Sequence, residues 1–531
     1  MKALRWRILV ALLGVALGAS ALSVLASTSA VQAAKSPSGS TFIYDTDLNT
    51  IGTPFDPATV YDSALLAMAN IYQTLTYYDS ATKTLQPELA TSWSSAHGGT
   101  VWTFNLRHNV YFHTGHLMTA AVVKSDVQRA VQLNQAASYE WDAVSSIDTP
   151  SQYTIVFHCS YAFPLAIASS SAYSAWIYDP DVPGVTNLAN WFNAGHDSGT
   201  GPYTVSSFTP NKETMVILKA FPGYWGGWSG KHYTQVVYRY TADSSTAALL
   251  LDSKQVTFVE TLSSQLWKGF KGKKGYQTPQ LLSWQNLLLT YNVATGPLSN
   301  LDFRKGVSEA INYNGILAAL AAGNVRTPGI VPPGLFGYDP KLPEYQLDLT
   351  GAKTLIAKSG INPKHVTLSM VAVVGETQEQ TAALIIKSDL ARLGITVTVR
   401  TVDAAGQEAL GDSTNPSSRP SIELFWWWPD YADPYSWFTS IFTKQNPPVW
   451  NFSGYSNTSL SSQINQVEST LAVSAAKGSQ SYEQMQKEIY QEDTTTSLFD
   501  LNYQRVLLGG VKGYSDNPAY PNVILAYRLT P

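Results

Sequence analysis

Asp430, which lies within a run of aromatic residues, is the residue of this sequence whose neighbours most favour ligand binding. Asp430 follows three consecutive tryptophans, Trp426 to Trp428, and Pro429. Proline cannot donate to a sheet ladder, so a strand that ends here brings Asp430 to the start of a loop. A carboxylate among indole rings needs a cationic or hydrogen-bonding partner, because an unpaired buried charge is costly. That partner can be a Lys or Arg of this chain, or the ammonium group of a ligand that also packs on the indoles.

The same residues also fit a purely structural role. Aromatic runs commonly form core, and the sequence Asp-Tyr-x-Asp-Pro is compatible with ordinary turn chemistry. Trp427 and Trp428 are neighbours on the predicted strand, so their side chains point to opposite faces and one of them is expected in the core. Asp433, which precedes Pro434, is expected to form a turn. The choice between a ligand-binding role and a structural role therefore depends on the rest of the sequence.

The sequence lacks the motifs that mark common hydrolases, metalloproteases and nucleotide-binding enzymes. It contains no Gly-x-Ser-x-Gly, no His-Glu-x-x-His and no Gly-x-x-x-x-Gly-Lys-Ser/Thr. The turn at residues 199–201 lacks the third glycine of a dinucleotide loop. His108, His113 and His116 do not have the spacing of a helical metal pair, so structural roles are expected for them. We therefore predict no catalytic residue, no metal and no cofactor.

The N-terminus has the features of a secretion signal. Lys2, Arg5 and Arg7 precede an apolar stretch at residues 8–26, and Val-Gln-Ala at residues 31–33 is a small-x-small cleavage site. We predict a signal peptide at residues 1–33 and a linker at residues 34–40; an uncleaved membrane anchor is the alternative. No Cys lies near the cleavage site, so a lipid anchor is not expected. The protein is expected to be exported, to the periplasm or to the cell surface and exterior.

Composition limits the classes of fold and partner. A chain of 531 residues is long enough for about two or three domains. Its 15 Trp and 30 Tyr suit a recognition cleft, because aromatic side chains offer wide contact area at low entropy cost. The net charge of −4 becomes more negative when the basic leader is removed, which argues against nucleic acid as a partner. The single Cys159 excludes an internal disulfide, and its phase with Ile155 and Phe157 predicts a buried small hydrophobe.

Hydrophobic periodicity predicts alternating strands and helices, which is typical of an α/β fold. Strands are predicted at residues 41–44, 101–107, 109–115, 153–159, 213–220, 235–240, 256–260, 286–291, 366–374, 395–399, 422–428, 498–503 and 524–528. Helices are predicted at residues 63–78, 244–251, 301–320, 350–358, 378–393 and 481–491, and another starts after Thr119. Residues 328–340 are rich in Pro and Gly and are expected to form an ordered loop.

A series of short motifs follows in order along the chain. They are Gln-Pro-Glu-Leu-Ala-Thr-Ser-Trp at residues 86–93, Phe-Asn-Leu-Arg at 104–107 with Phe-His-Thr-Gly at 112–115, Gly-Thr-Gly-Pro-Tyr at 199–203, the aromatic block 221–225, Phe-Arg at 303–304, Val-Pro-Pro-Gly at 331–334, Gly-Tyr-Asp-Pro at 337–340 and Asp-Tyr-Ala-Asp-Pro at 430–434. Each motif is weak alone, but their order over nearly all of the chain after the leader is specific. The chain resembles family 5 of the bacterial extracellular solute-binding proteins, the peptide/nickel-binding substrate-binding proteins of ABC transporters.

The resemblance implies a two-lobed α/β fold of the periplasmic-binding-protein type (type II, cluster C) with an extra subdomain on lobe I. Lobe I would comprise residues 41–75, 197–282 and 498–531. The extra subdomain would comprise residues 76–196, and lobe II residues 283–497. A hinge of two segments would close the lobes on a ligand held between them.

The resemblance also implies roles for particular residues. Asp430 matches the acid that holds the ligand's N-terminal ammonium in peptide-binding members. The backbone at residues 426–428 would pair with an extended ligand like an added strand. The implied ligand-binding residues are Asp430, Trp426, Trp427, Trp428 and Tyr431 of lobe II, and Tyr61, Asp62 and Ser63 of lobe I.

Two departures from the family pattern affect the expected ligand. Dipeptide-binding members place an Arg for the ligand carboxylate near residues 371–375, which here read Val-Ala-Val-Val-Gly. The family's Asp-Arg after the 301–320 helix is replaced here by Asn312-Tyr313. A ligand carboxylate would therefore need another partner, which leaves room for longer peptides or for sugars stacked on the indoles.

The expected function is that of the substrate-binding component of an ABC importer. The chain would capture an oligopeptide or dipeptide by lobe closure and dock, as a monomer, on a membrane permease without doing chemistry. One alternative is an oligosaccharide-binding protein of an ABC importer. Others, from different classes, are a secreted hydrolase and a signalling or chaperone-like receptor with the same fold.

Overall fold

Four β-sheets organise the residues that the computed structural model describes, which are 41–48, 51, 55–61, 63–320, 323–411, 413–445, 448 and 450–531. The predicted signal peptide (1–33), the predicted linker (34–40) and the candidate ligand residue Asp62 lie outside these residues. Contacts join the described residues into one compact unit.

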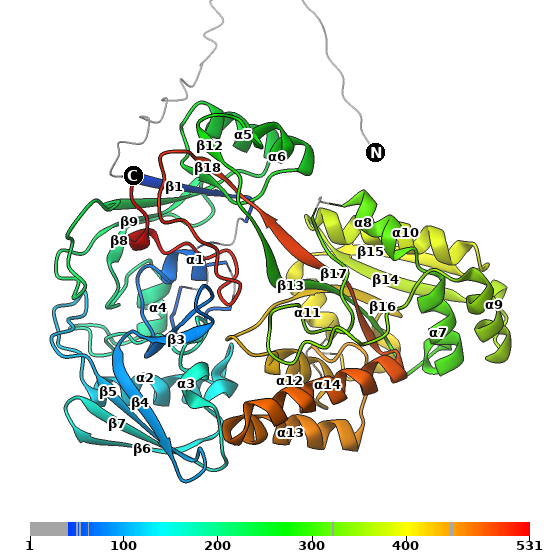
Figure 1. The fold of residues 1–531 in the computed structure, drawn as a ribbon, viewed down its shortest axis with the longest axis horizontal. Helices are drawn as coiled ribbons and strands as arrows, with labels where there is room; N and C mark the ends of the chain where they lie inside the picture. Colours follow the sequence, from blue (N-terminus) through cyan, green and yellow to red (C-terminus); the bar gives the residue numbers. More distant parts are fainter. Residues whose placement is uncertain are drawn as a thin grey trace, which may run out of the picture. The chain divides into compact units, whose positions relative to one another are not determined.

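The first sheet has seven strands and β1 near its middle (Figure 1). β1 is parallel to both of its neighbours, and its side chains Phe42 and Tyr44 are fully buried. In sheet order, the strands are β12 (Tyr276–Gln277), β18 (Val506–Leu508), β11 (Phe258–Val259), β1 (Thr41–Thr46), β10 (Gln235–Tyr240), β9 (Thr214–Ala220) and β8 (Tyr203–Phe208). The helices of these segments are α1 (Leu65–Met68), α5 (Ser244–Asp252) and α6 (Ser264–Phe270).

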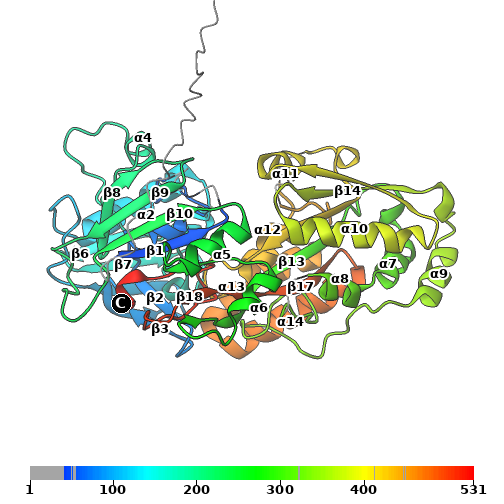
Figure 2. The same ribbon diagram turned by 90° about the horizontal axis from the view of Figure 1, so that it is seen from above.

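The second sheet has five strands and carries the tryptophan-rich segment. In sheet order, the strands are β15 (Thr396–Val402), β14 (Thr367–Val373), β16 (Ile422–Trp427), β13 (Gln280–Tyr291) and β17 (Thr495–Gln504). The helices and 3₁₀ turns of these segments are η2 (Pro297–Ser299), α7 (Leu301–Ala310), α8 (Tyr313–Ala319), α9 (Leu349–Lys358), η3 (Pro363–His365), α10 (Thr377–Ala391), α11 (Ala404–Gly411), η4 (Pro416–Ser418), α12 (Tyr435–Phe442), α13 (Thr458–Val473) and α14 (Ala475–Glu492). Figure 2 shows α10 lying along β14, which it connects to the parallel strand β15.

The two smaller sheets lie between β1 and β8 in the sequence. An antiparallel sheet of four strands has the order β4 (Ala90–Ala96), β5 (Val101–Leu106), β7 (Thr154–Cys159) and β6 (Val144–Ser151). β2 (Thr76–Asp79) and β3 (Thr84–Pro87) form a separate hairpin. The remaining helical segments are α2 (Ala120–Leu133), η1 (Ser138–Trp141), α3 (Leu165–Ala168), α4 (Leu188–Asn193) and, near the C-terminus, η5 (Ala526–Arg528).

The chain crosses between the seven-stranded and the five-stranded sheet at two adjoining points. Residues 278–279 join β12 to β13, and Arg505 joins β17 to β18. β13 and β17 then run side by side as an antiparallel pair that starts at Gln280 and Gln504 (Figure 1). Two short, adjacent connections are the structure that a hinge requires. Both strands run through the lobe boundaries predicted at 282/283 and 497/498, and the exact lobe assignment remains a prediction.

Local chemistry explains where several elements begin and end. Thr119 accepts a hydrogen bond from the backbone N–H of Val122 and so caps α2, as its sequence position predicts. Gly394 follows α10 with a φ of 85°, the left-handed conformation that glycine adopts without strain, and it ends the helix as expected. Cys159 is buried, in agreement with the sequence, and burial raises the pKa of its thiol to about 11.

The structure corrects four of the predicted elements. The predicted helix 63–78 ends at Met68, and its last residues form β2 of the hairpin. The predicted helix 301–320 breaks into α7 and α8, because the Asn312 side chain accepts from Gly315 N and starts a second helix. Residues 109–115 form no strand beyond a single bridge at Tyr111, and residues 524–528 form a loop and the turn η5 instead of a strand.

Candidate ligand-binding site

Asp430 lies in the loop that follows β16, three residues after the end of the strand at Trp427, and it is 1% exposed. Its Oδ1 accepts a hydrogen bond of 3.0 Å from the hydroxyl of Tyr61, and its Oδ2 accepts one from the hydroxyl of Tyr139. Its main-chain oxygen accepts a 2.9 Å hydrogen bond from Ser171 Oγ. Three donors from three separate segments of the chain therefore converge on this one residue.

No cation of the described residues neutralises this carboxylate. Asp430 has no ion pair with any Lys or Arg that the structure describes. Burial raises its pKa to about 6, against the opposing effect of the hydrogen bonds from Tyr139 and Tyr61. Glu140 is also buried, and its pKa is raised first by burial and then by the charge of Asp430. The two acids thus form a buried site with a deficit of positive charge, which a ligand cation can fill.

Aromatic side chains with unsatisfied polar groups surround Asp430. The rings of Tyr61 and Tyr173 lie 5.0 Å apart. The indole of Trp428 lies beside the Tyr173 hydroxyl, but neither polar group makes a hydrogen bond of normal geometry within the described residues. Glu140 Oε1 is buried and unsatisfied in the same way. Unpaired buried donors and acceptors are costly, so their concentration here favours a ligand that supplies the missing partners.

The three tryptophans have different surroundings. Trp427 is 4% exposed, packs on Phe425, and donates from Nε1 to Ser436 Oγ at 3.2 Å, so it is a core residue. Trp428 is half-buried beside Tyr173.

Trp426 is also half-buried, and it donates from Nε1 to Glu376 Oε2 at 3.1 Å. Asp430 and Trp428 thus lie together, while Trp427 faces the opposite side, as the alternation of a strand requires. The contact of any of the three with a ligand remains a prediction.

The other predicted site residues also separate. Tyr431 is 2% exposed and packs in the core beneath the four-stranded sheet. Ser63 lies in the turn before α1, where its carbonyl accepts from Leu66 N at 3.1 Å. Asp433 Oδ1 accepts from Tyr435 N at 2.9 Å and from the Tyr482 hydroxyl at 2.6 Å, which is the turn role expected from the sequence.

One edge of β16 is open where the tryptophans lie. β14 pairs with β16 only through Met370–Ile422 and Val371–Glu423. Gln407 Nε2 covers the next carbonyl, that of Leu424, at 2.9 Å. Residues 425–427 therefore have ladder partners in β13 but none on the side of β14 among the described strands. An extended ligand can form backbone hydrogen bonds at such an edge.

The sequence did not indicate four residues of this cluster: Tyr139, Glu140, Ser171 and Tyr173. They lie in η1 and in the loop after α3, within no motif that we recognised. Only the folded chain brings them to the end of β16, about 260 to 290 residues away in the sequence.

The three histidines have separate structural partners. His108 stacks on Tyr153 with ring centroids 4.0 Å apart. His113 contacts Asp197 through Nδ1 and the carbonyl of Gly201 through Nε2. His116 Nδ1 lies 2.8 Å from Asp179. No group of three or more His, Cys, Asp and Glu side chains in the described residues is arranged to hold a metal ion.

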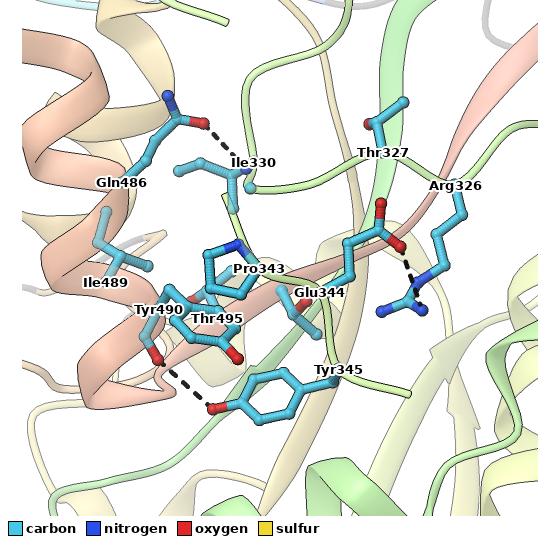
Figure 3. Close-up of a pocket in the computed structure, with 12 residues that line it drawn as sticks. Arg326, Thr327, Ile330, Pro343, Glu344, Tyr345, Gln486, Ile489, Tyr490 and Thr495 are labelled. Atoms are coloured by element: carbon cyan, nitrogen blue, oxygen red, sulfur yellow. Dashed lines mark hydrogen bonds and ion pairs between the residues drawn. The ribbon is translucent and has the colours of Figure 1, made fainter. Parts of the chain in front are cut away.

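Among the described residues, two of the cavities lie outside the Asp430 cluster. The smaller, of about 20 Å³, has room for roughly one water molecule and lies beside Arg326 and Glu344, beneath the loop that leads to α9 (Figure 3). The larger is an open cleft of about 460 Å³, which we call the hairpin cleft. Its lining residues are Tyr78, Lys83, Trp284, Gly334, Leu335, Phe336, Gly337, Tyr338, Ala432 and Ser479.

Comparison with known sequences identifies the family. The sequence model described as bacterial extracellular solute-binding proteins, family 5 (middle region) matches residues 84–448, more than half of the chain. The chain belongs to this family. The family 5 protein is 26% identical over 447 residues to the probable D,D-dipeptide-binding periplasmic protein DdpA of Escherichia coli strain K12. That match covers 83% of this chain and 84% of the relative.

Solved structures share the fold of this family 5 protein. The periplasmic binding protein DppA of Helicobacter pylori, in complex with the peptide STSA, is 22% identical, with a TM-score of 0.80 over 92% of this chain and 98% of that one. NikZ of Campylobacter jejuni, in complex with Ni(L-His), is 17% identical, with a TM-score of 0.81 over 93% of this chain and 100% of that one. The predicted two-lobed α/β fold is thereby confirmed. Within the described residues, no helix has both the length and the apolar character to cross a bilayer.

Proposed function

We propose that this solute-binding protein captures peptides by their N-terminal ammonium group and delivers them to a membrane permease. The observation that carries the proposal is the carboxylate of Asp430, buried without a cation of the described chain and bonded only to tyrosine hydroxyls. An ammonium ion is small, carries three donors and can satisfy Asp430 and Glu140 together. The open edge at residues 425–427 would bind the backbone of the same ligand.

The relatives support a peptide as the ligand class. DdpA is described as a probable binder of D,D-dipeptides, and the Helicobacter protein was solved with a bound peptide. Backbone pairing and an ammonium anchor are common to all peptides, so such a site would tolerate many side chains.

Ligand binding would be coupled to lobe closure. Asp430 follows β16 of the five-stranded sheet, whereas Tyr61 lies between β1 of the seven-stranded sheet and α1, and Tyr139 lies in η1. A ligand ammonium placed among these groups would contact both sides of the hinge and stabilise the closed form. The peptide would leave unaltered, because the proposed role includes no catalytic group.

Calorimetry with alanine peptides tests the proposal. The wild-type protein is expected to bind peptides with a free amino terminus and to reject their N-acetylated forms. Asp430→Asn keeps the side-chain volume and removes the charge, so it is expected to weaken binding of the free peptides by about 2–4 kcal/mol. Unchanged affinity would remove the anchor role of Asp430.

Asp433→Asn is the matched control, because Asp433 is a buried acid in the same loop that does not contact Tyr61. It is expected to retain the preference for a free amino terminus. Binding of oligosaccharides in place of peptides would support the sugar-receptor alternative.

A further inference from the structure

The hairpin cleft is a second surface for a ligand, next to the Asp430 cluster. Its walls come from the β2–β3 hairpin, from β13, from the loop at residues 334–338 and from α14. Four aromatic residues line it, namely Tyr78, Trp284, Phe336 and Tyr338. Its volume of about 460 Å³ lies within the range of small-molecule sites.

Lys83 is the one charged side chain among the ten described residues that line this cleft. It is exposed, and it forms no ion pair with an acid of the described chain. The turn of the hairpin holds it at a φ of 56°, directly before β3. The cleft therefore presents a free positive charge above aromatic walls, whereas the Asp430 cluster presents a negative one.

The hairpin cleft and the Asp430 cluster are connected through neighbouring residues and hydrogen bonds. Ala432, two residues after Asp430, lines the cleft. Tyr78 also lines the cleft; its backbone N donates to the Tyr520 hydroxyl at 2.9 Å, and that hydroxyl donates to Ser170 O at 3.1 Å. The next residue, Ser171, donates to Asp430 O at 2.9 Å. Two lining residues of the cleft, Ala432 and Tyr78, are thus connected to Asp430 through a few bonded residues.

We propose that the hairpin cleft receives the carboxyl-terminal part of a bound peptide and that Lys83 pairs with its terminal carboxylate. The proposal rests on the proposed function, because it takes the amino end of the same peptide to lie at Asp430. Opposite charges at the two positions match the two ends of a zwitterionic peptide. The aromatic walls would pack on its last side chains without selecting among them. Lys83 would then supply the carboxylate partner for which residues 371–375 offer no cation.

The test uses alanine peptides of increasing length, each as the free acid and as the C-terminal amide, in calorimetry with the full chain. The wild-type protein is expected to bind the free acid about three- to tenfold more tightly than the amide, at the length whose end reaches Lys83. Lys83→Asn is expected to bring this ratio close to one. Asn tolerates the left-handed backbone, so the variant is expected to fold.

Lys254→Asn is the matched control, because Lys254 is also an exposed lysine with a positive φ, of 60°, and does not line the cleft. It is expected to keep the wild-type ratio. An unchanged ratio in Lys83→Asn, or no acid preference at any length in the wild type, would overturn the role of the cleft alone. Loss of binding on N-acetylation would still support the Asp430 anchor in that case. Failure of every alanine peptide to bind would overturn the proposed function as well.

Discussion

The hydroxyl of Tyr61 donates a 3.0 Å hydrogen bond to Oδ1 of Asp430, across 369 positions of the sequence. Tyr139 donates to the other oxygen of the same carboxylate. These two bonds join the end of β16 to segments that belong with the other sheets. A ligand ammonium would join or replace these two hydrogen bonds. Their contribution to the stability of the ligand-free protein can be measured without a ligand.

Tyr61→Phe is expected to lower the free energy of unfolding of the ligand-free protein by about 1–2 kcal/mol. The change removes one donor and leaves a buried carboxylate oxygen without a partner. Denaturant unfolding followed by circular dichroism measures the effect. Tyr111→Phe is the control, since Tyr111 is 46% exposed, and it is expected to change stability little. Equal effects of the two substitutions would contradict the importance of the Tyr61 bond.

Peptide affinity is expected to decrease as the pH falls below about 6. Burial raises the pKa of Asp430 to about 6, and a protonated carboxyl cannot pair with an ammonium ion. The association constant of a peptide with a free amino terminus should approach a loss of roughly tenfold per pH unit below that point. Calorimetry from pH about 5 to about 7.5 measures this slope. Asp430→Asn should show no such slope; a slope of the same size in that variant would assign the titration to another group.

Stability of the ligand-free protein is expected to be higher at mildly acidic than at mildly alkaline pH. Burial raises the pKa of Glu423 to about 8, above its unfolded value, so the folded state holds a proton that the unfolded chain has lost. The resulting stability is complete below the unfolded pKa and is lost as the pH rises towards about 8. Glu379, with a pKa raised to about 8 mainly by burial, contributes in the same direction.

Glu423→Gln is therefore expected to raise the free energy of unfolding at alkaline pH by roughly 2–4 kcal/mol, and to change it little at pH about 4. Gln407 lies 3.2 Å from Glu423 and can still bond to the new amide. Thermal unfolding at the two pH values measures the effect. Asp181→Asn, at an exposed position, is the control. A variant that is no more stable than the wild type at alkaline pH would contradict a buried, protonated Glu423.

Gly201→Ala is expected to destabilise the fold by about 2–4 kcal/mol. A Cβ at this position would lie 2.6 Å from the backbone oxygen of Ile71, which cannot move without its segment. Gly269→Ala is the matched control within α6, where a Cβ meets no atom within 4 Å. It is expected to stabilise the protein by about 0.5–1 kcal/mol, because alanine favours the helix. Similar unfolding midpoints for the two variants would show that the turn at residues 199–203 is not closely packed.

The sequence predicted the positions of strands and helix caps correctly where local interactions determine them. Alternation of apolar residues predicted β5 and β10, and Thr119 marked the start of α2. Pro429 correctly ended the tryptophan-rich strand, which placed Asp430 at its tip. Periodicity failed where tertiary contacts decide. The apolar pattern of α2 includes Val131, but Val131 is 46% exposed, because α2 buries Val123, Val127 and Ala130 instead.

The residues of the site could be predicted from the sequence only in part. The sequence offered Asp430 but left open whether Trp427 or Trp428 faces the core, and the fold places Trp427 there. Tyr139 and Tyr173 could not be found, since long-range packing alone brings them to the carboxylate. The proposed role of Lys83 could not be predicted from the sequence either, because distant segments of the chain form the other walls of the cleft.

The pairing of Gln277 with Leu507, and of Gln280 with Gln504, means that residues 278–505 leave and re-enter the first sheet at neighbouring positions. This stretch is topologically an insert, and its ends can be closed by a short linker. Recombination between genes of this architecture can therefore exchange the whole cassette in one event. Such an exchange would replace the part of the site that carries Asp430 and keep the part that carries Tyr61. Ligand preference can therefore change through one of the two parts while the other stays the same.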